Sequence, residues 1–394
     1  MLALRLTRGA HPLVLLRRLL VAAASAGVGF LLLCVLGYAA GHPEHAAAAA
    51  TRLLWCLVPL AATVQFAVAV ARTDPGTRPR PGLSAVGLGP ARLTVIAAVS
   101  TAVSCLLGSM VALLFFLHLR GDLSGMPFDG AAAGLLGANV PLPLAGALTL
   151  LALTPVAAAT ASALALRNRP TTAADATSGE FSGAGAAEDT APAAPPSGLP
   201  WGVALTAAGL AVESYTDHGP TGGLLPLPGR LESAPAFVLA GWALTAVGLA
   251  LAGPGLTHLC GRLVQAVRPG GVRLLAGRML MSEAHRIGRP LGVLCAVLSG
   301  IVAAASLSGA GQRVFGPLTV LGAVLVVGCT TATLLTSALE TRQTRARTTD
   351  TLLRLGAPAA SLRGATALRT GALLALFAPL TWAIAALAAL PLSA

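Results

Sequence analysis

The chain has 394 residues, of which 55% are hydrophobic and only 10% are charged. Soluble domains devote about a quarter of their residues to charged side chains, so this composition excludes an ordinary soluble protein. All 26 basic residues are Arg, and the formal net charge is +12. Because a P-loop needs a Lys to reach the nucleotide phosphates, the chain is not itself expected to be a P-loop ATPase.

Apolar runs of roughly 20 residues recur along the sequence, and this length crosses about 30 Å of hydrocarbon as an α-helix. They predict an all-α, polytopic integral membrane protein with about nine transmembrane helices. The helices are expected near residues 20–40, 52–71, 93–118, 142–166, 200–217, 235–256, 291–308, 315–338 and 366–390. The run near 200–217 is the weakest, because its apolar part, Leu199 to Val212, has only 14 residues.

The Arg residues are distributed unevenly between the two sides of this nine-helix arrangement. With the N-terminus in the cytoplasm, 22 Arg face the cytoplasm and only four lie outside, namely Arg52, Arg120, Arg230 and Arg313. An excess of basic residues in cytoplasmic loops is the usual signal of orientation. The sequence therefore predicts a multi-pass protein of the cell (plasma) membrane with a cytoplasmic N-terminus and an extracellular C-terminus. Removing the span near 200–217 would place Arg-rich loops outside, so the distribution favours keeping it.

Residues 168–199 differ in kind from the rest of the chain. They are rich in Ala, Pro, Gly, Ser and Thr and carry four acidic residues, a composition typical of a disordered linker. A regulatory or partner-binding role for this segment stays open. The predicted organisation is a first unit of four spans (1–167), a cytoplasmic linker (168–199), two linking spans (200–257) and a second unit of three spans (258–394).

Two landmarks recur at nearly the same separation. Arg-containing segments that begin at Arg5 and Arg273, 268 residues apart, precede the first and seventh spans and are expected to be interfacial approach helices. Leu-Gly pairs at 88–89 and 355–356 are 267 residues apart. Agreement between two unrelated landmarks indicates an internal duplication. A counterpart of the fourth span would lie near 409–433, so the second unit is expected to have three spans.

The segment 339–363 combines a basic stretch with spaced Leu residues and a Gly-Ala pair. It contains Glu340, Arg342, Arg345, Arg347, Leu352, Leu355, Gly356, Ala357 and Leu362. This pattern resembles the short cytoplasmic segment that joins the second and third core helices in the FtsX-like permease family of ABC transporters. The resemblance implies that 339–363 docks on a separate nucleotide-binding subunit similar to LolD or FtsE. It also implies that the chain couples ATP hydrolysis by that subunit to export or to force transmission across the membrane.

The repeat places the segment 72–92 at the position equivalent to 339–363, and so predicts a second, weaker docking segment there. Its candidate residues are Arg72, Arg78, Arg80, Leu88, Gly89 and Arg92. The segment lacks the Glu of the second unit and contains four Pro residues, which break helices. The loops expected outside, 41–51 and 309–314, are also too short for the extracellular domain that this family usually carries. These departures favour an alternative, a degenerate membrane scaffold or sensor that does not transport.

The sequence shows no other chemistry that would assign a function. Candidate catalytic, metal-binding and cofactor-binding sites are all absent from it, so the chain is not expected to be an enzyme. Ser104 and Ser109 are expected to bond to their own helix backbone, and the central parts of the spans carry no charge, which argues against an ion-coupled carrier. The expected partners are the ATPase subunit and membrane lipid, with no nucleic acid. Association as a dimer or heterodimer stays open.

Overall fold

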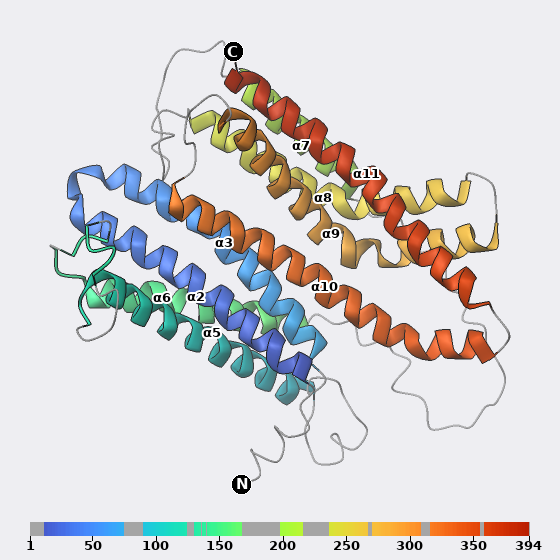
Figure 1. Ribbon diagram of the computed structural model, residues 1–394, viewed down its shortest axis with the longest axis horizontal. Helices are drawn as coiled ribbons and strands as arrows, with labels where there is room; N and C mark the ends of the chain where they lie inside the picture. Colours follow the sequence, from blue (N-terminus) through green and yellow to red (C-terminus); the bar gives the residue numbers. More distant parts are fainter. Residues whose placement is uncertain are drawn as a thin grey trace, which may run out of the picture.

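The computed structural model describes residues 12–74, 90–123, 130–134, 136–138, 140–167, 198–215, 236–266, 270–308, 316–354 and 358–393. Across these residues the regular structure is helical and contains no strand, which confirms the predicted all-α class (Figure 1). The helices are α2 (Pro12–Gly41), η1 (Pro43–His45), α3 (Ala46–Thr73), α5 (Pro90–Arg120), α6 (Leu144–Arg167), α7 (Gly198–Tyr215), α8 (Ala236–Ala266), α9 (Gly271–Ser308), α10 (Pro317–Arg354) and α11 (Ala359–Ser393).

Eight helices of the described chain are long and apolar enough to cross a membrane, and each coincides with a predicted span. They are α2, α3, α5, α6, α8, α9, α10 and α11. The weak span near 200–217 corresponds to α7, whose apolar part is the shorter stretch Gly198–Val212. With 18 residues, α7 is about 27 Å long, slightly less than the thickness of the hydrocarbon core. The chain is a multi-pass membrane protein.

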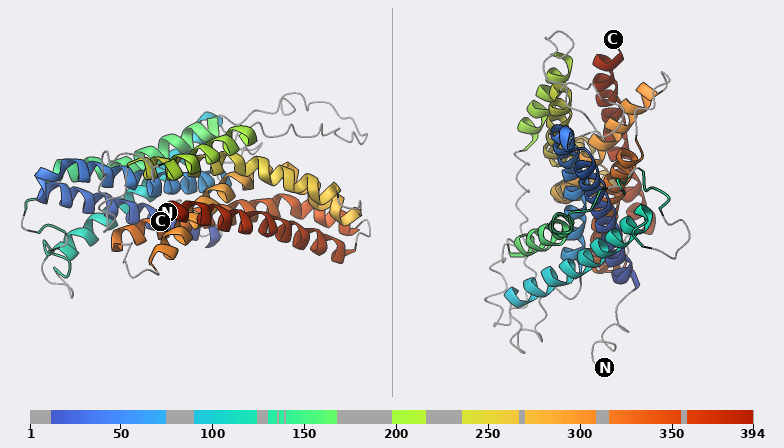
Figure 2. Two further views of the ribbon diagram at one scale, coloured as in Figure 1. Left: turned by 90° about the horizontal axis from the view of Figure 1, so that it is seen from above. Right: turned by 90° about the vertical axis from the view of Figure 1, so that its left-hand side faces the viewer.

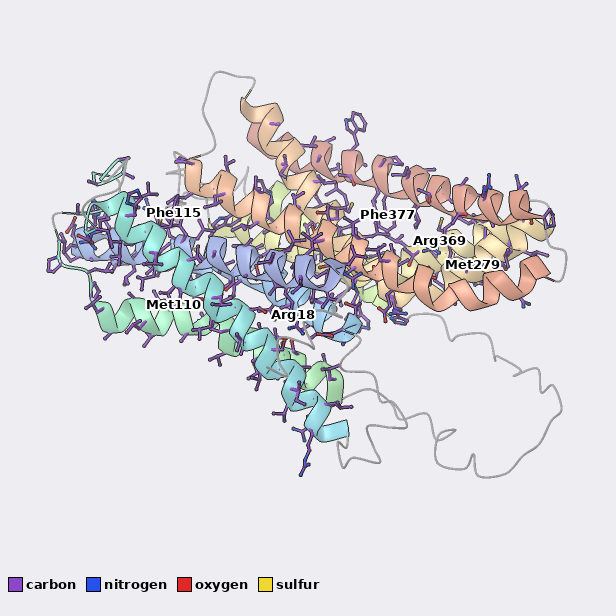
Figure 3. All side chains as sticks on the ribbon, turned by 60° about the horizontal axis from the view of Figure 1, so that its bottom comes forward. Arg18, Met110, Phe115, Met279, Arg369 and Phe377 are labelled. Carbon is purple, nitrogen blue, oxygen red and sulfur yellow. The ribbon has the colours of Figure 1, made fainter. Side chains whose placement is uncertain are left out.

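Large apolar side chains cover the outside of the helix bundle. On α5 the exposed ones recur every three or four residues and form one continuous face, consisting of Val95, Ile96, Val99, Val103, Leu106, Leu107, Met110, Val111, Leu114 and Phe115. Met110 and Phe115 mark this face in Figure 3. A contiguous apolar face of this length is not stable in water, whereas lipid chains cover it without cost.

Small hydroxyl side chains lie inside the bundle and join neighbouring helices. Ser25 of α2 donates to the carbonyl of Cys105 of α5 at 2.8 Å, and Ser109 of α5 donates to that of Leu151 of α6 at 3.1 Å. The expectation that Ser109 bonds to its own helix is therefore wrong, while it is confirmed for Ser104, which donates to Ser100. Ser109 reaches α6 because its side chain is buried between the two helices, where close packing favours small polar residues.

Glycines allow α7, α8 and α9 to pack closely. A methyl group on Gly253 of α8 would collide with the backbone of Gly288 of α9, and one on Gly292 with the carbonyl of Leu249. The contact between α7 and α8 is similar, since a Cβ atom on Gly202 would overlap the backbone of Ala252. Small residues at helix contacts are the usual means of close approach in membranes. The close packing of these three helices therefore depends on glycines at their contacts.

The helices of the second unit are longer than predicted. α9 runs unbroken through Pro290, so the expected separation between an approach helix from Arg273 and a span from residue 291 is wrong. An interior Pro removes one backbone hydrogen bond and bends a helix without necessarily ending it, and α9 changes direction partway in Figure 1. In the first unit, the approach segment lies outside the described residues up to His11, and its remainder belongs to α2.

The two units meet mainly where α3 packs against α10. Phe66 of α3 shares a buried apolar cluster with Val326 and Cys329 of α10. At the same contact, Thr63 Oγ1 lies 3.6 Å from Cys329 Sγ. α3 and α10 are equivalent helices in the predicted repeat, so the units contact each other through equivalent elements. Figure 2 shows that α8 to α11 extend beyond the helices of the first unit at one end of the bundle.

Candidate functional site

The candidate docking segment of the second unit is largely helical. Glu340, Arg342, Arg345, Arg347 and Leu352 lie on α10, which continues past its apolar part to Arg354. Leu362 lies on α11, and Leu355, Gly356 and Ala357 fall outside the described residues. The predicted end of the helix α10 at residue 338 is therefore wrong, since the first part of the segment continues this helix. The charged, Thr-rich sequence after Glu340 forms an extension of the helix, because it has neither Gly nor Pro to end it.

The candidate docking segment of the first unit is described only at its two ends. Arg72 is exposed in the last turn of α3, and Arg92 is exposed in the first turn of α5. Arg78, Arg80, Leu88 and Gly89 lie outside the described residues. The segment therefore joins the ends of α3 and α5, as the second segment joins α10 and α11.

An ion pair fixes the start of the second docking segment to the neighbouring helix. Arg286 of α9 donates to Glu340 of α10, with 2.5 Å between Nη2 and Oε2. The Glu340 side chain is 14% exposed and that of Arg286 is 51% exposed. Glu340 is thus held by α9 at the point where the apolar part of α10 ends.

A second ion pair occupies the corresponding place in the first unit. Arg18 of α2 donates to Asp74, directly after α3, with 2.6 Å between Nη2 and Oδ2. Arg18 and Arg286 are 268 residues apart, which is the separation of the predicted repeat. Asp74 and Glu340 are 266 residues apart, the same separation as Thr63 and Cys329 at the contact between the units. In each unit, an Arg on the first helix therefore binds an acidic residue at the start of the docking segment, which lies directly after α3 in the first unit and at the end of the apolar part of α10 in the second.

A third ion pair is present in the second unit and lies deeper in the structure. Arg369 of α11 binds Glu283 of α9, and their side chains are 15% and 8% exposed. Figure 3 shows Arg369 on α11 near Met279 of α9. Glu283 and Arg286 are three residues apart, so α9 carries charges for both partners on neighbouring positions of one face. The second docking segment is thus attached to α9 near its start through Glu340 and shortly after its end through Arg369.

The two positions of the first unit that are equivalent to this third pair carry no charge. At a separation of 268 residues, Leu15 and Thr101 stand where the second unit has Glu283 and Arg369. Thr101 is buried and donates to the carbonyl of Ala97 in its own helix. Beside it, a hollow of about 20 Å³ lies between α2, α3 and α5, with room for about one water molecule. The ion pair Arg18–Asp74 therefore attaches the first docking segment to α2 at its start.

Sequence reasoning missed most of these partners. In the sequence the Arg residues read as signals of topology, and no motif singles out Asp74 or Glu283. Applying the repeat separation to charged residues would have matched Arg18 with Arg286, and it would have matched Asp74 with Glu340 once a difference of two residues was allowed. It would not have found Glu283–Arg369, because the equivalent positions of the first unit carry no charge.

Comparison with known proteins assigns neither a family nor a function to this arrangement of residues. No protein-family model, curated protein or solved structure matches the chain.

Proposed function

We propose that the chain is the permease subunit of an ABC transporter and resembles the FtsX-like class. A separate LolD- or FtsE-like ATPase would dock on the segments 72–92 and 339–363 from the cytoplasm and drive export or force transmission. The observation that carries the proposal is the pair of equivalent ion pairs, Arg18–Asp74 and Arg286–Glu340. Each attaches the beginning of a docking segment to the first helix of its unit.

The arrangement of these segments suits a partner that binds as two copies. Equivalent helices, α3 and α10, pack against each other, as expected around a pseudo-two-fold axis. Thr63 and Cys329, which have the same separation as the acidic residues of the two pairs, meet at this contact. Two docking segments related by such an axis would present similar surfaces to two ATPase subunits. A movement of either segment would reach α2 or α9 through its ion pair.

The Arg286–Glu340 pair gives a direct test of coupling. Arg286 is half exposed, so the pair contributes about 1 kcal/mol or less to stability, and its removal should leave the fold intact. We expect Glu340→Gln and Arg286→Glu each to lower the ATPase activity of the complex several-fold. The exchanged double variant, Arg286→Glu with Glu340→Arg, should recover it. The measurement is ATP hydrolysis by an ATPase encoded beside this gene, reconstituted with the chain in nanodiscs.

Arg278→Gln is the matched control, since Arg278 is an exposed Arg on the same helix, and it should behave as wild type. Failure of the wild-type chain to bind the ATPase would contradict the proposal. Binding without any change in ATP hydrolysis would instead favour the alternative, a non-transporting scaffold or sensor. Unchanged hydrolysis in both single variants would remove the ion pair from the coupling path while leaving docking intact.

The proposal requires the docking segments to face the cytoplasm, and cysteine labelling tests this. All six native Cys are buried, so a membrane-impermeant maleimide should label the wild-type chain poorly. We expect Gly41→Cys, at the end of α2, to react in intact cells. Ser361→Cys, at the start of α11, should react only after permeabilisation. The opposite pattern would invert the orientation and exclude cytoplasmic docking.

A further inference from the structure

Two buried N–H groups lie close together near the start of α3. Arg52 Nε and Trp55 Nε1 are both shielded by protein and have no hydrogen-bond acceptor among the residues that the structure describes. Arg52 and Trp55 are three residues apart, so they lie on one face of the helix. A shielded donor without an acceptor is costly, and native proteins seldom leave one. Two at one place indicate that an acceptor from outside the chain belongs there.

Both side chains line a hollow of about 20 Å³ between α2, α3 and α10. Its remaining walls come from apolar or sulfur-containing side chains, among them Leu31, Val35 and Leu318, and include no carboxylate. Arg52 takes part in no ion pair within the described ranges. The space admits one group of about the size of a water molecule. A single oxygen atom of a larger anion fits these walls and these donors.

The two donors are held in place by aromatic and backbone contacts. The guanidinium of Arg52 lies 3.4 Å from the centre of the Tyr38 ring. The ring of His42 stacks on the Tyr38 ring, with 4.5 Å between the two ring centres. Trp55 Nε1 lies so close to Gly322 that a Cβ atom there would be 3.3 Å away. The donors are therefore positioned before any ligand binds, which reduces the entropic cost of binding.

We propose that Arg52 and Trp55 bind the phosphate of a membrane phospholipid. A guanidinium matches phosphate oxygens in geometry and charge, and Tyr and Trp are enriched where headgroups meet hydrocarbon. Leu54 and Leu57, the neighbours of these residues on α3, are 64% and 49% exposed and offer an apolar surface for the acyl chains. The site takes a phosphodiester headgroup at one end of the bundle, apart from the ion pairs of the docking segments.

Native mass spectrometry of the full chain, delipidated and titrated with phosphatidylglycerol, tests this site. We expect Arg52→Gln to weaken binding of the first lipid about tenfold, because a charged hydrogen bond is lost. Trp55→Phe keeps an aromatic side chain and removes the N–H donor together with part of the indole, so it should weaken binding about fivefold without unfolding the chain. The matched control is Trp382→Phe on α11, whose side chain is 71% exposed and should leave binding unchanged.

A parallel titration with inorganic phosphate distinguishes binding of a lipid phosphate group from binding of free phosphate. Lipid binding that free phosphate does not displace at millimolar concentration supports the proposal. Phosphate binding without lipid binding would make this a site for a soluble anion and overturn it. The proposal also fails if both variants retain the lipid affinity of the wild type, because the hollow would then hold no more than water.

Discussion

Replacing Arg369 by Met is expected to destabilise the folded chain by about 3–5 kcal/mol, because the buried Glu283 carboxylate would lose the cation that binds it. The Glu283 side chain is only 8% exposed, so solvent compensates little of the lost interaction. Unfolding in mixed detergent and SDS micelles, followed by tryptophan fluorescence, measures the difference. Arg369 also joins α11 to α9, so we expect protease sensitivity near the start of α11 to rise.

Two further variants separate this ion pair from general damage. The double variant Glu283→Gln with Arg369→Met removes both charges and should recover most of the stability, since replacing a whole buried pair is far less costly than breaking it. Arg286→Met, which breaks the half-exposed pair with Glu340, should cost about 1 kcal/mol or less. Equal losses for Arg369→Met and Arg286→Met would contradict the idea that burial sets the energy of these pairs.

The spans were predictable because the membrane imposes a length and a composition on every crossing helix. Each predicted span coincides with a helix, including the short run near 200–217, which forms α7. Helix ends that lie beyond the apolar spans were less predictable. Water is available there, so neither charge nor the loss of hydrophobicity forces the helix to stop, and α10 continues from Glu340 to Arg354.

The candidate site was only partly accessible from the sequence. Glu340 belongs to a motif in the sequence, whereas its partner Arg286 is only one of the 22 Arg that the predicted topology places on one side. Pairing depends on how adjacent helices rotate about their axes, which single-chain patterns do not determine. The repeat is the exception, because a charge that recurs at the same separation in two units implies a contact that recurs as well.

The differences between the two units matter for coupling. The second docking segment is attached to α9 through Glu340 near its start and through Arg369 shortly after its end, whereas among the described residues the ion pair between the first segment and α2 is that of Asp74. A segment that is fixed at two places passes its movement to the helix more directly, because less of the segment can move independently. If the chain couples to an ATPase as proposed, variants of the second segment should impair coupling more than matched variants of the first. The proline-rich sequence of the first segment agrees with this ranking.

Adding one methyl group at a helix contact should have the other large effect on stability. A Cβ atom on Gly253 would collide with the carbonyl of Gly288, and one on Gly108 with the carbonyl of Ala22. In both cases the obstacle is backbone, which cannot move aside as a flexible side chain does, so whole helices must separate. We expect Gly253→Ala and Gly108→Ala each to cost about 3 kcal/mol or more, measured by the same unfolding titration and by the yield of monodisperse protein.

Gly300→Ala is the matched control, because Gly300 lies on α9 with open space around its Cβ position. Ala favours a helix over Gly by about 1 kcal/mol, so this variant should be as stable as wild type or slightly more stable. The contrast isolates packing from helix propensity, since all three substitutions make the same chemical change within a helix. Equal stability of the three variants would mean that these helices are farther apart than their glycines indicate. A loss of stability at Gly253 and Gly108 but not at Gly300 would show that close approach stabilises the contact of α8 with α9 and that of α2 with α5.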